Sequence, residues 1–147
     1  MDYQLIPLAH EHLGQAAEIE RLCFSDPWSE KMLAEHLANP CSLTLAAVDG
    51  AGRLLGYVGL LAVVDEGYIT KVAVRPDCRR QGVASSLLQA LEARGRARNL
   101  TFLTLEARQS NAPARALYEK LGYVQAGLRR NYYENPREDA VIMTKTL

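Results

Sequence analysis

The chain has 147 residues, of which 48% are hydrophobic and 23% are charged, and its 17 basic side chains balance its 17 acidic ones. This length and apolar content predict one domain, residues 1–147, with a buried core. The balanced charge gives no indication of direct nucleic-acid binding, no apolar run approaches the roughly 18 residues of a membrane span, and the N-terminus lacks the regions of a signal peptide, so we expect a cytoplasmic protein without a membrane contact.

The first 40 residues are predicted to form a strand and two helices. YQLIPL, residues 3–8, is typical of a short strand, and apolar residues then recur at helical spacing over residues 13–24. Pro27 interrupts this pattern. Ser29 is a candidate N-cap for a second helix, which Asn39 and Pro40 end.

The rest of the chain alternates between strand and helix patterns. Three consecutive strands, largely antiparallel, are predicted in SLTLAAV, LLGYVGLLAVV and YITKVAVRP, with a polar break at Asp65-Glu66-Gly67. A helix over residues 82–98, the strand FLTLEA and a helix over residues 113–121 follow, and the strands YVQAGLRRNYY and DAVIMTKTL end the chain. This order predicts an α/β fold whose mixed, mostly antiparallel sheet is flanked by helices.

The cysteines and histidines give no indication of a metal site. The three cysteines are odd in number, and their spacing matches neither a disulfide framework nor a zinc motif, so free thiols are expected. The three histidines are expected to lie at the surface, and no metal is predicted. These residues are Cys23, Cys41, Cys78, His10, His12 and His36.

The segment RRQGVASS, residues 79–86, lies between a predicted strand and a predicted helix. A helix start exposes about four unpaired N–H groups that favour phosphate, and Gly82 and Ala84 allow an anion to approach the backbone closely. Arg79 and Arg80 add positive charge. The pattern indicates a pyrophosphate cradle, although Gly82 alone would equally fit an ordinary connection with two solvated arginines.

The spacing of Arg79, Gly82 and Ala84 resembles the coenzyme A signature of the GNAT acetyltransferase superfamily, [Arg/Gln]-x-x-Gly-x-[Gly/Ala]. Ala84 stands where many members have a second glycine. The stretches FSDPWSEKML, LEARQSNAPARALYEKLGY and RRNYYENPREDAVIM extend the resemblance over essentially the whole chain. They are similar to the bacterial ribosomal-protein alanine N-acetyltransferase family, the RimI type.

This resemblance implies a GNAT-like sheet whose fourth and fifth strands splay apart, with acetyl-CoA as co-substrate in the gap. The fourth strand would bind the pantetheine arm through its backbone while its side chains pack in the core, and the cradle would hold the pyrophosphate. The implied coenzyme-binding residues are Val72, Ala73, Val74, Arg80, Gln81, Gly82, Val83, Ala84, Ser85 and Asn111.

Acetyl transfer to an amine benefits from a base for the ammonium proton and an acid for the departing thiolate. Alternation in FLTLEA places Glu106 on one face with Phe102 and Thr104. An isolated glutamate at a strand end is more often solvated, and a helical tyrosine is more often part of the core. The resemblance implies that Glu106 is the base and that Tyr118, twelve positions later, is the acid.

The acceptor amine is expected to be a protein N-terminus. An α-amine has a pKa of about 8 and a lysine about 10.4, so at neutral pH the α-amine has a neutral fraction larger by a factor of a few hundred. The resemblance implies the N-terminal alanine of small-subunit ribosomal protein eighteen, followed by an arginine and aromatic residues. Candidate groove residues are Trp28, Tyr132 and Tyr133, with Asp65, Glu66, Glu134, Glu138 or Asp139 to meet the arginine.

Two alternatives remain open. The coenzyme motif is shared by GNAT enzymes that acetylate a lysine side chain or a small amine. A non-catalytic acyl-CoA-binding module would also keep this motif, but the presence of both Glu106 and Tyr118 argues against it.

Overall fold

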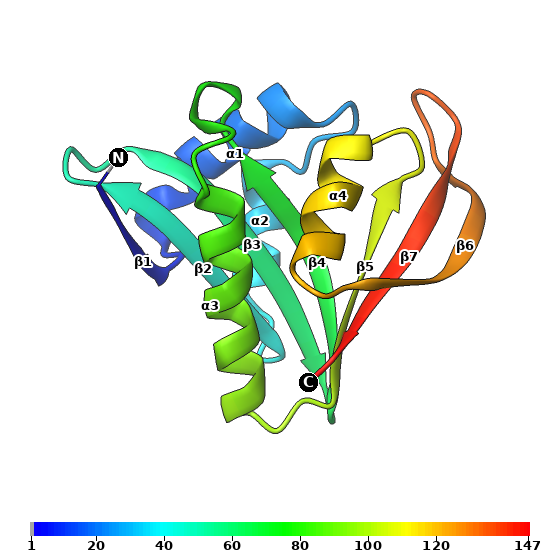
Figure 1. Ribbon diagram of the computed structural model, residues 1–147. Helices are drawn as coiled ribbons and strands as arrows, with labels where there is room; N and C mark the ends of the chain where they lie inside the picture. The colour runs from blue at the N-terminus through cyan, green and yellow to red at the C-terminus, as the bar shows by residue number, and fades with distance from the viewer. Residues whose placement is uncertain (1) are drawn as a thin grey trace.

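The computed structural model describes residues 2–147, which form a seven-stranded sheet with helices on both faces (Figure 1). The predicted order of strands and helices is confirmed. The elements are β1 (Tyr3–Pro7), α1 (Leu13–Cys23), α2 (Glu30–Ala38), β2 (Ser42–Asp49), β3 (Leu54–Val63), β4 (Glu66–Val74), α3 (Val83–Ala97), β5 (Phe102–Arg108), α4 (Ala112–Lys120), β6 (Val124–Tyr133) and β7 (Glu138–Thr146).

The connection between β3 and β4 is tighter than predicted. Glu66 and Gly67 were predicted as part of a polar break, but both belong to β4, where they pair with Val63 and Ala62 of β3. Gly67 is needed for close packing rather than for a turn, because a Cβ there would lie 2.6 Å from the Leu103 side chain.

The sheet has the strand order β1-β2-β3-β4-β5-β7-β6, and β4 and β5 are its only parallel neighbours among residues 2–147. These two strands pair only between residues 66–68 and residues 102–104. Beyond that point β4 continues along β3, while β5 continues along β7 as far as Arg108. The mixed, mostly antiparallel sheet with a splay between the fourth and fifth strands is therefore confirmed.

The helices divide the core into two layers. Helices α3 and α4 cover one face of the sheet, and α1 and α2 cover the other (Figure 1). Helix α3 buries Val83, Leu87, Leu88 and Leu91, which lie on one side of the helix at the predicted spacing. Each such side chain contributes about 1.5–3 kcal/mol on full burial, which holds the helix start firmly beside the splay.

The predictions for the cysteines are confirmed, and those for the histidines are only partly correct. The three cysteines are free, as predicted. The surface position predicted for His12 is wrong, because the residue is only 6% exposed and its Nδ1 accepts a hydrogen bond from the Ala9 N–H at 2.9 Å. His36 is half-buried, and its Nε2 lies 3.0 Å from the Thr70 hydroxyl.

Within residues 2–147, no helix is both long and apolar enough to cross a bilayer. Over the same residues, no three histidine, cysteine or acidic side chains gather closely enough to hold a metal ion.

Candidate active site

Two grooves meet at the splay between β4 and β5. The α3 groove, of about 590 Å³, lies between residues 72–74, the start of α3 and α4. The β5 groove, of about 370 Å³, lies between the loop that joins α1 to α2, residues 105–108 and the end of β6. The grooves share the side chains of Val72 and Tyr118, so a molecule in one can contact a molecule in the other. Other shared lining residues are Cys23, Phe24, Asn111 and Ala114.

The start of α3 forms one end of the α3 groove. Gly82 is the residue that precedes the helix, and its φ of +79° is a left-handed conformation that favours glycine. Arg80 is also left-handed, with a φ of +61°. Because the first N–H groups of a helix lack partners within it, this end of the groove presents several donors. A Cβ at Gly82 would meet no atom within 4 Å, so the space beside it is open.

The structure gathers nearly all of the predicted coenzyme-binding residues around one groove. Gln81 is the exception, because it is exposed and does not line the groove. Asn111 caps α4 by accepting a hydrogen bond from the Ala114 N–H at 3.2 Å, which leaves its amide N–H groups available. Of the residues predicted to bind the coenzyme, those that line the groove are Val72, Ala73, Val74, Arg80, Gly82, Val83, Ala84, Ser85 and Asn111.

Arg79 and Cys23 also line this groove and make contacts that were not predicted, although Arg79 was expected to add positive charge to the cradle. Arg79 donates from Nε to the Val74 carbonyl at 3.3 Å and from Nη2 to the Cys23 sulfur at 3.4 Å. The thiol of Cys23 also donates to the Val74 carbonyl at 3.3 Å. These contacts fasten the end of α1 to the end of β4, which no local sequence pattern indicates.

Glu106 lies in the β5 groove. Burial alternates along β5, with Leu103, Leu105 and Ala107 inside, so Glu106 is on the opposite face, as predicted. Its side chain is 26% exposed and pairs with the Arg129 Nε at 3.1 Å. The partner on β6 could not be recognised from the sequence.

Tyr118 is the side chain at which the two grooves meet. It is 7% exposed, and this burial raises its pKa well above the ordinary value, with a smaller contribution from Tyr133. The hydroxyl therefore keeps its proton throughout the pH range of ordinary enzymes. A neutral phenol can donate a hydrogen bond to a developing negative charge.

The three aromatic residues named as candidates for a peptide groove, Trp28, Tyr132 and Tyr133, all line the β5 groove. The rings of Tyr132 and Tyr133 are perpendicular, with their centroids 5.0 Å apart. Burial, with a smaller effect of Tyr132 and Glu106, raises the pKa of Tyr133 to about 12.

Most of the acidic residues that were expected to meet the arginine of the peptide lie away from the β5 groove or bind other groups of the protein. Glu66 pairs with Phe102 at the closed end of the splay, and Asp65 precedes it, so neither adjoins the β5 groove. The structure places Asp26, which was not predicted, among the groove's lining residues. Of the others, Glu138 binds Arg108, Asp139 accepts from the Asn131 N–H, and Glu134 is exposed.

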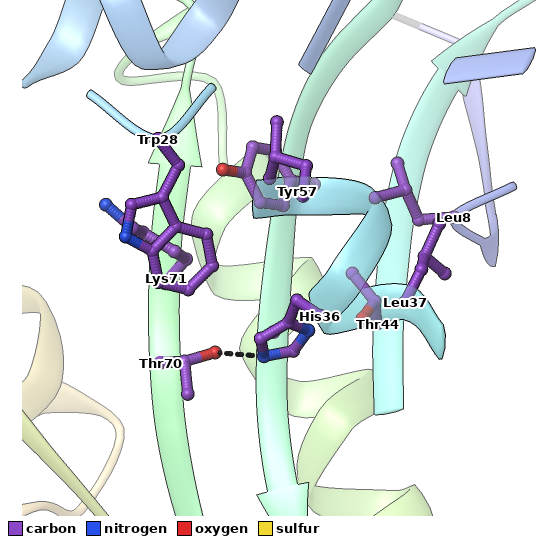
Figure 2. A pocket seen from close by; sticks show the side chains of 10 residues that line it. Leu8, Trp28, His36, Leu37, Thr44, Tyr57, Thr70 and Lys71 are labelled. Atoms are coloured by element: carbon purple, nitrogen blue, oxygen red, sulfur yellow. Dashed lines mark hydrogen bonds between the residues drawn. The ribbon is translucent and has the colours of Figure 1, made fainter. Parts of the chain in front are cut away.

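A buried ion pair holds the α1–α2 loop, residues 24–29, against the sheet. Glu20 is fully buried and accepts hydrogen bonds from the Trp28 N–H at 2.8 Å, the Lys71 Nζ at 3.1 Å and the Tyr57 hydroxyl. Figure 2 shows Lys71 beside the Trp28 ring, whose centroid lies 4.6 Å from Nζ. Removing one partner of such a pair costs about 3–5 kcal/mol, so this wall of the β5 groove is firmly placed.

The splayed sheet and the helix start beside it define the class of protein. Residues 13–123 match the acetyltransferase (GNAT) family, and the chain belongs to this family of N-acetyltransferases. The ribosomal protein bS18-alanine N-acetyltransferase of Escherichia coli (strain K12) is 39% identical over 133 residues, which cover 89% of this chain and 88% of that protein. The resemblance predicted from the sequence is thus confirmed.

Solved structures support the same assignment. The crystal structure of the ribosomal-protein-S18-alanine N-acetyltransferase from Escherichia coli matches with a TM-score of 0.90 and 36% identity, over 99% of this chain and 94% of that one. The PaiA N-acetyltransferase from Thermoplasma acidophilum, in complex with coenzyme A, shares the fold at 17% identity, with a TM-score of 0.82 over the full length of both chains.

Proposed function

We propose that this protein transfers the acetyl group of acetyl-CoA to the N-terminal α-amine of a protein, and that its substrate is the N-terminal alanine of ribosomal protein bS18. The main observation in support is the meeting of two grooves at Tyr118, one with a helix start and one with the carboxylate of Glu106. The relative from Escherichia coli, which carries this activity in its name, supports the choice of substrate. A ribosomal substrate fits the cytoplasmic location expected from the sequence.

Acetyl-CoA is assigned to the α3 groove. The N–H groups of residues 82–85 and the charge of Arg80 are suited to the pyrophosphate, and the open space at Gly82 leaves room for it. Beyond residue 68 the edge of β4 has no ladder partner on β5, so its backbone is free to pair with the pantetheine amides. The Val74 carbonyl already accepts from Arg79 and Cys23, and the backbone groups of Ala73 face β3, where Ala73 pairs with Tyr57, which leaves Val72 and the Val74 N–H as the pairing groups.

The peptide N-terminus is assigned to the β5 groove, where Glu106 accepts a proton from the α-ammonium. The neutral nitrogen then attacks the thioester carbonyl, a C–N bond forms, the C–S bond breaks, and the departing thiolate accepts a proton from Tyr118. At the ordinary pKa values, transfer from a tyrosine to a free thiolate is uphill by about 2 kcal/mol, and the raised pKa of Tyr118 increases this cost. Tyr118 therefore donates while the C–S bond is breaking, rather than after it.

An acetylation assay with mass-spectrometric localisation tests this proposal. In three separate reactions, the protein and acetyl-CoA are incubated with one acceptor each: an Ala-Arg-Tyr-Phe peptide, an N-blocked lysine peptide or a small diamine. We expect the acetyl group on the α-nitrogen of the first peptide. Preferred acetylation of the lysine peptide or the diamine would favour the enzymatic alternatives, and binding of acetyl-CoA without any product would favour a non-catalytic module. Unchanged activity in the presence of a chelator would agree with the prediction that no metal is needed.

A further inference from the structure

Arg108, the last residue of β5, binds the α1–α2 loop, which lines the β5 groove, and the turn that follows Tyr133 of the same groove. Its Nη2 donates to the hydroxyl of Ser25 at 3.4 Å, in the α1–α2 loop, and to the Glu134 carbonyl at 3.0 Å. Its Nη1 donates to the Pro136 carbonyl at 2.9 Å. The β6–β7 turn, residues 134–137, is therefore joined to the α1–α2 loop through one guanidinium group.

The guanidinium is itself held on two other sides. Glu138 accepts from Nη1 at 3.2 Å, and the Tyr133 ring lies with its centroid 4.5 Å from the central carbon of the group. The other oxygen of Glu138 accepts from the Ser110 N–H at 2.5 Å. This hydrogen bond, together with Arg108, lowers the pKa of Glu138, so its carboxylate stays charged.

A second bridge crosses between the same two segments. The side-chain amide of Asn135, in the β6–β7 turn, donates to the carboxylate of Asp26 in the α1–α2 loop at 3.0 Å. Asp26 lines the β5 groove, as do Ser25 and Arg108. The two segments thus meet beside the groove through side chains that are far apart in the sequence.

We propose that Arg108 is a positioning residue that latches the α1–α2 loop to the β6–β7 turn and so fixes the shape of the β5 groove for its amine substrate. The proposal rests on the proposed function, which assigns this groove to the peptide N-terminus. Arg108 acts through Ser25, Tyr133 and the carbonyls of the turn, and the proton transfers are left to Glu106 and Tyr118.

Arginine is suited to this position and lysine is not. A guanidinium has five N–H donors spread over a rigid plane, and here they serve two main-chain carbonyls, one hydroxyl and one carboxylate. An ammonium keeps the charge but concentrates three donors at one atom, so it cannot span both segments. The latch therefore depends on shape as well as charge, and the two contributions can be separated by substitution.

The test compares Arg108→Lys and Arg108→Ala with the parent enzyme in steady-state kinetics on the Ala-Arg-Tyr-Phe peptide. We expect both variants to raise the KM for the peptide by about tenfold or more, since small displacements of a substrate-positioning group are costly. The Kd for acetyl-CoA, measured by calorimetry, should stay within about twofold because the α3 groove is not lined by Arg108. Arg96→Ala, which removes an ion-paired arginine on α3, serves as the control and should leave both values unchanged.

Hydrogen exchange provides a readout that does not depend on the reaction. The amides of residues 24–29 and 134–137 should exchange faster in Arg108→Lys and Arg108→Ala, while those of β2 stay protected. Asn135→Ala, which breaks only the second bridge, should show a smaller effect in the same segments. A parental KM and parental exchange in Arg108→Lys would overturn the latch. If the parent acetylates no peptide, the proposed function fails, and the exchange data still decide whether the latch exists.

Discussion

The rings of Tyr118 and Tyr123 lie 6.0 Å apart, yet their hydroxyl groups have different surroundings. Tyr118 borders both grooves, whereas the Tyr123 hydroxyl is buried with no hydrogen-bond partner among residues 2–147. Tyr118→Phe should therefore lower kcat by about a hundredfold or more while acetyl-CoA affinity is kept, because only a proton donor is lost.

Tyr123→Phe is the matched control for this substitution. It removes a hydroxyl from the neighbouring ring, and we expect an unchanged kcat and a slight gain in stability, of about 1 kcal/mol, because an unpaired buried hydroxyl is removed. Stopped-flow or quench measurements of the chemical step, with thermal unfolding of both variants, check these outcomes. Equal kcat values for both variants and the parent would assign Tyr118 to packing.

Glu106→Gln should impair the reaction most at neutral pH. There, roughly a tenth of a free α-amine with a pKa near 8 is neutral, so a base is needed, whereas above about pH 9 most of the amine is already deprotonated. The ratio of parent to variant kcat/KM should thus fall as the pH rises from 6.5 to 9.5. The substitution also removes the exposed ion pair with Arg129, which lowers the free energy of unfolding by at most about 1 kcal/mol. A defect that is the same at every pH would indicate that Glu106 positions the amine instead.

Gly82→Val should abolish acetyl-CoA binding, since its side chain would fill the open space at the start of α3. The substitution also strains a left-handed residue, which costs about 1–2 kcal/mol. Gly52 has a nearly identical φ, +82°, and likewise no atom within 4 Å of a built Cβ, and it does not line the α3 groove. Gly52→Val therefore carries the strain alone and should bind acetyl-CoA like the parent in calorimetry. If Gly82→Val also binds acetyl-CoA like the parent, the assignment of the pyrophosphate to the start of α3 is wrong.

The stability of the fold should decrease in mild acid because of His36. Burial lowers the pKa of His36 below its ordinary value of about 6.5, so the unfolded chain binds more protons than the folded one between the two pKa values. The free energy of unfolding is thus highest above the unfolded pKa and falls as the pH drops below about 6.5. Urea unfolding of the parent and of His36→Gln from pH 5 to 8 isolates this contribution, and a pH-independent difference between them would refute it.

Local patterns carried the prediction of the fold. Periodicity over residues 83–91 and alternation in β5 each reflect burial on one side of an element, and this is a property that a sequence displays directly. The position of Gly82 immediately before α3 was predictable for the same reason, since a glycine at the start of a helix is a short-range signal. The splay was different, because no residue in the sequence of β4 or β5 indicates that the pairing of these strands ends at Tyr68 and Thr104. Only the resemblance to the family implied the splay.

Contacts between distant segments account for what the sequence did not predict. The pairing of Arg129 with Glu106 and the contacts of Arg108 and Asp26 arise only when the sheet brings separate loops together. His12 is buried because it caps a short turn through Ala9, which overrides the tendency of histidine to lie at the surface. Gln81 occupies a motif position, but the left-handed backbone on either side of it leaves it outside the groove.

The short pairing between β4 and β5 also has a mechanical consequence. Only residues 66–68 and 102–104 join the two strands, so the sheet consists of two plates, β1–β4 and β5–β7, with a joint at one end. A small rotation about this joint changes the separation at the open end and breaks no ladder hydrogen bond between the plates, because none lies there. We therefore expect the sheet to yield most easily at the open end of the splay, where the proposed function places the two substrates, and least within each plate.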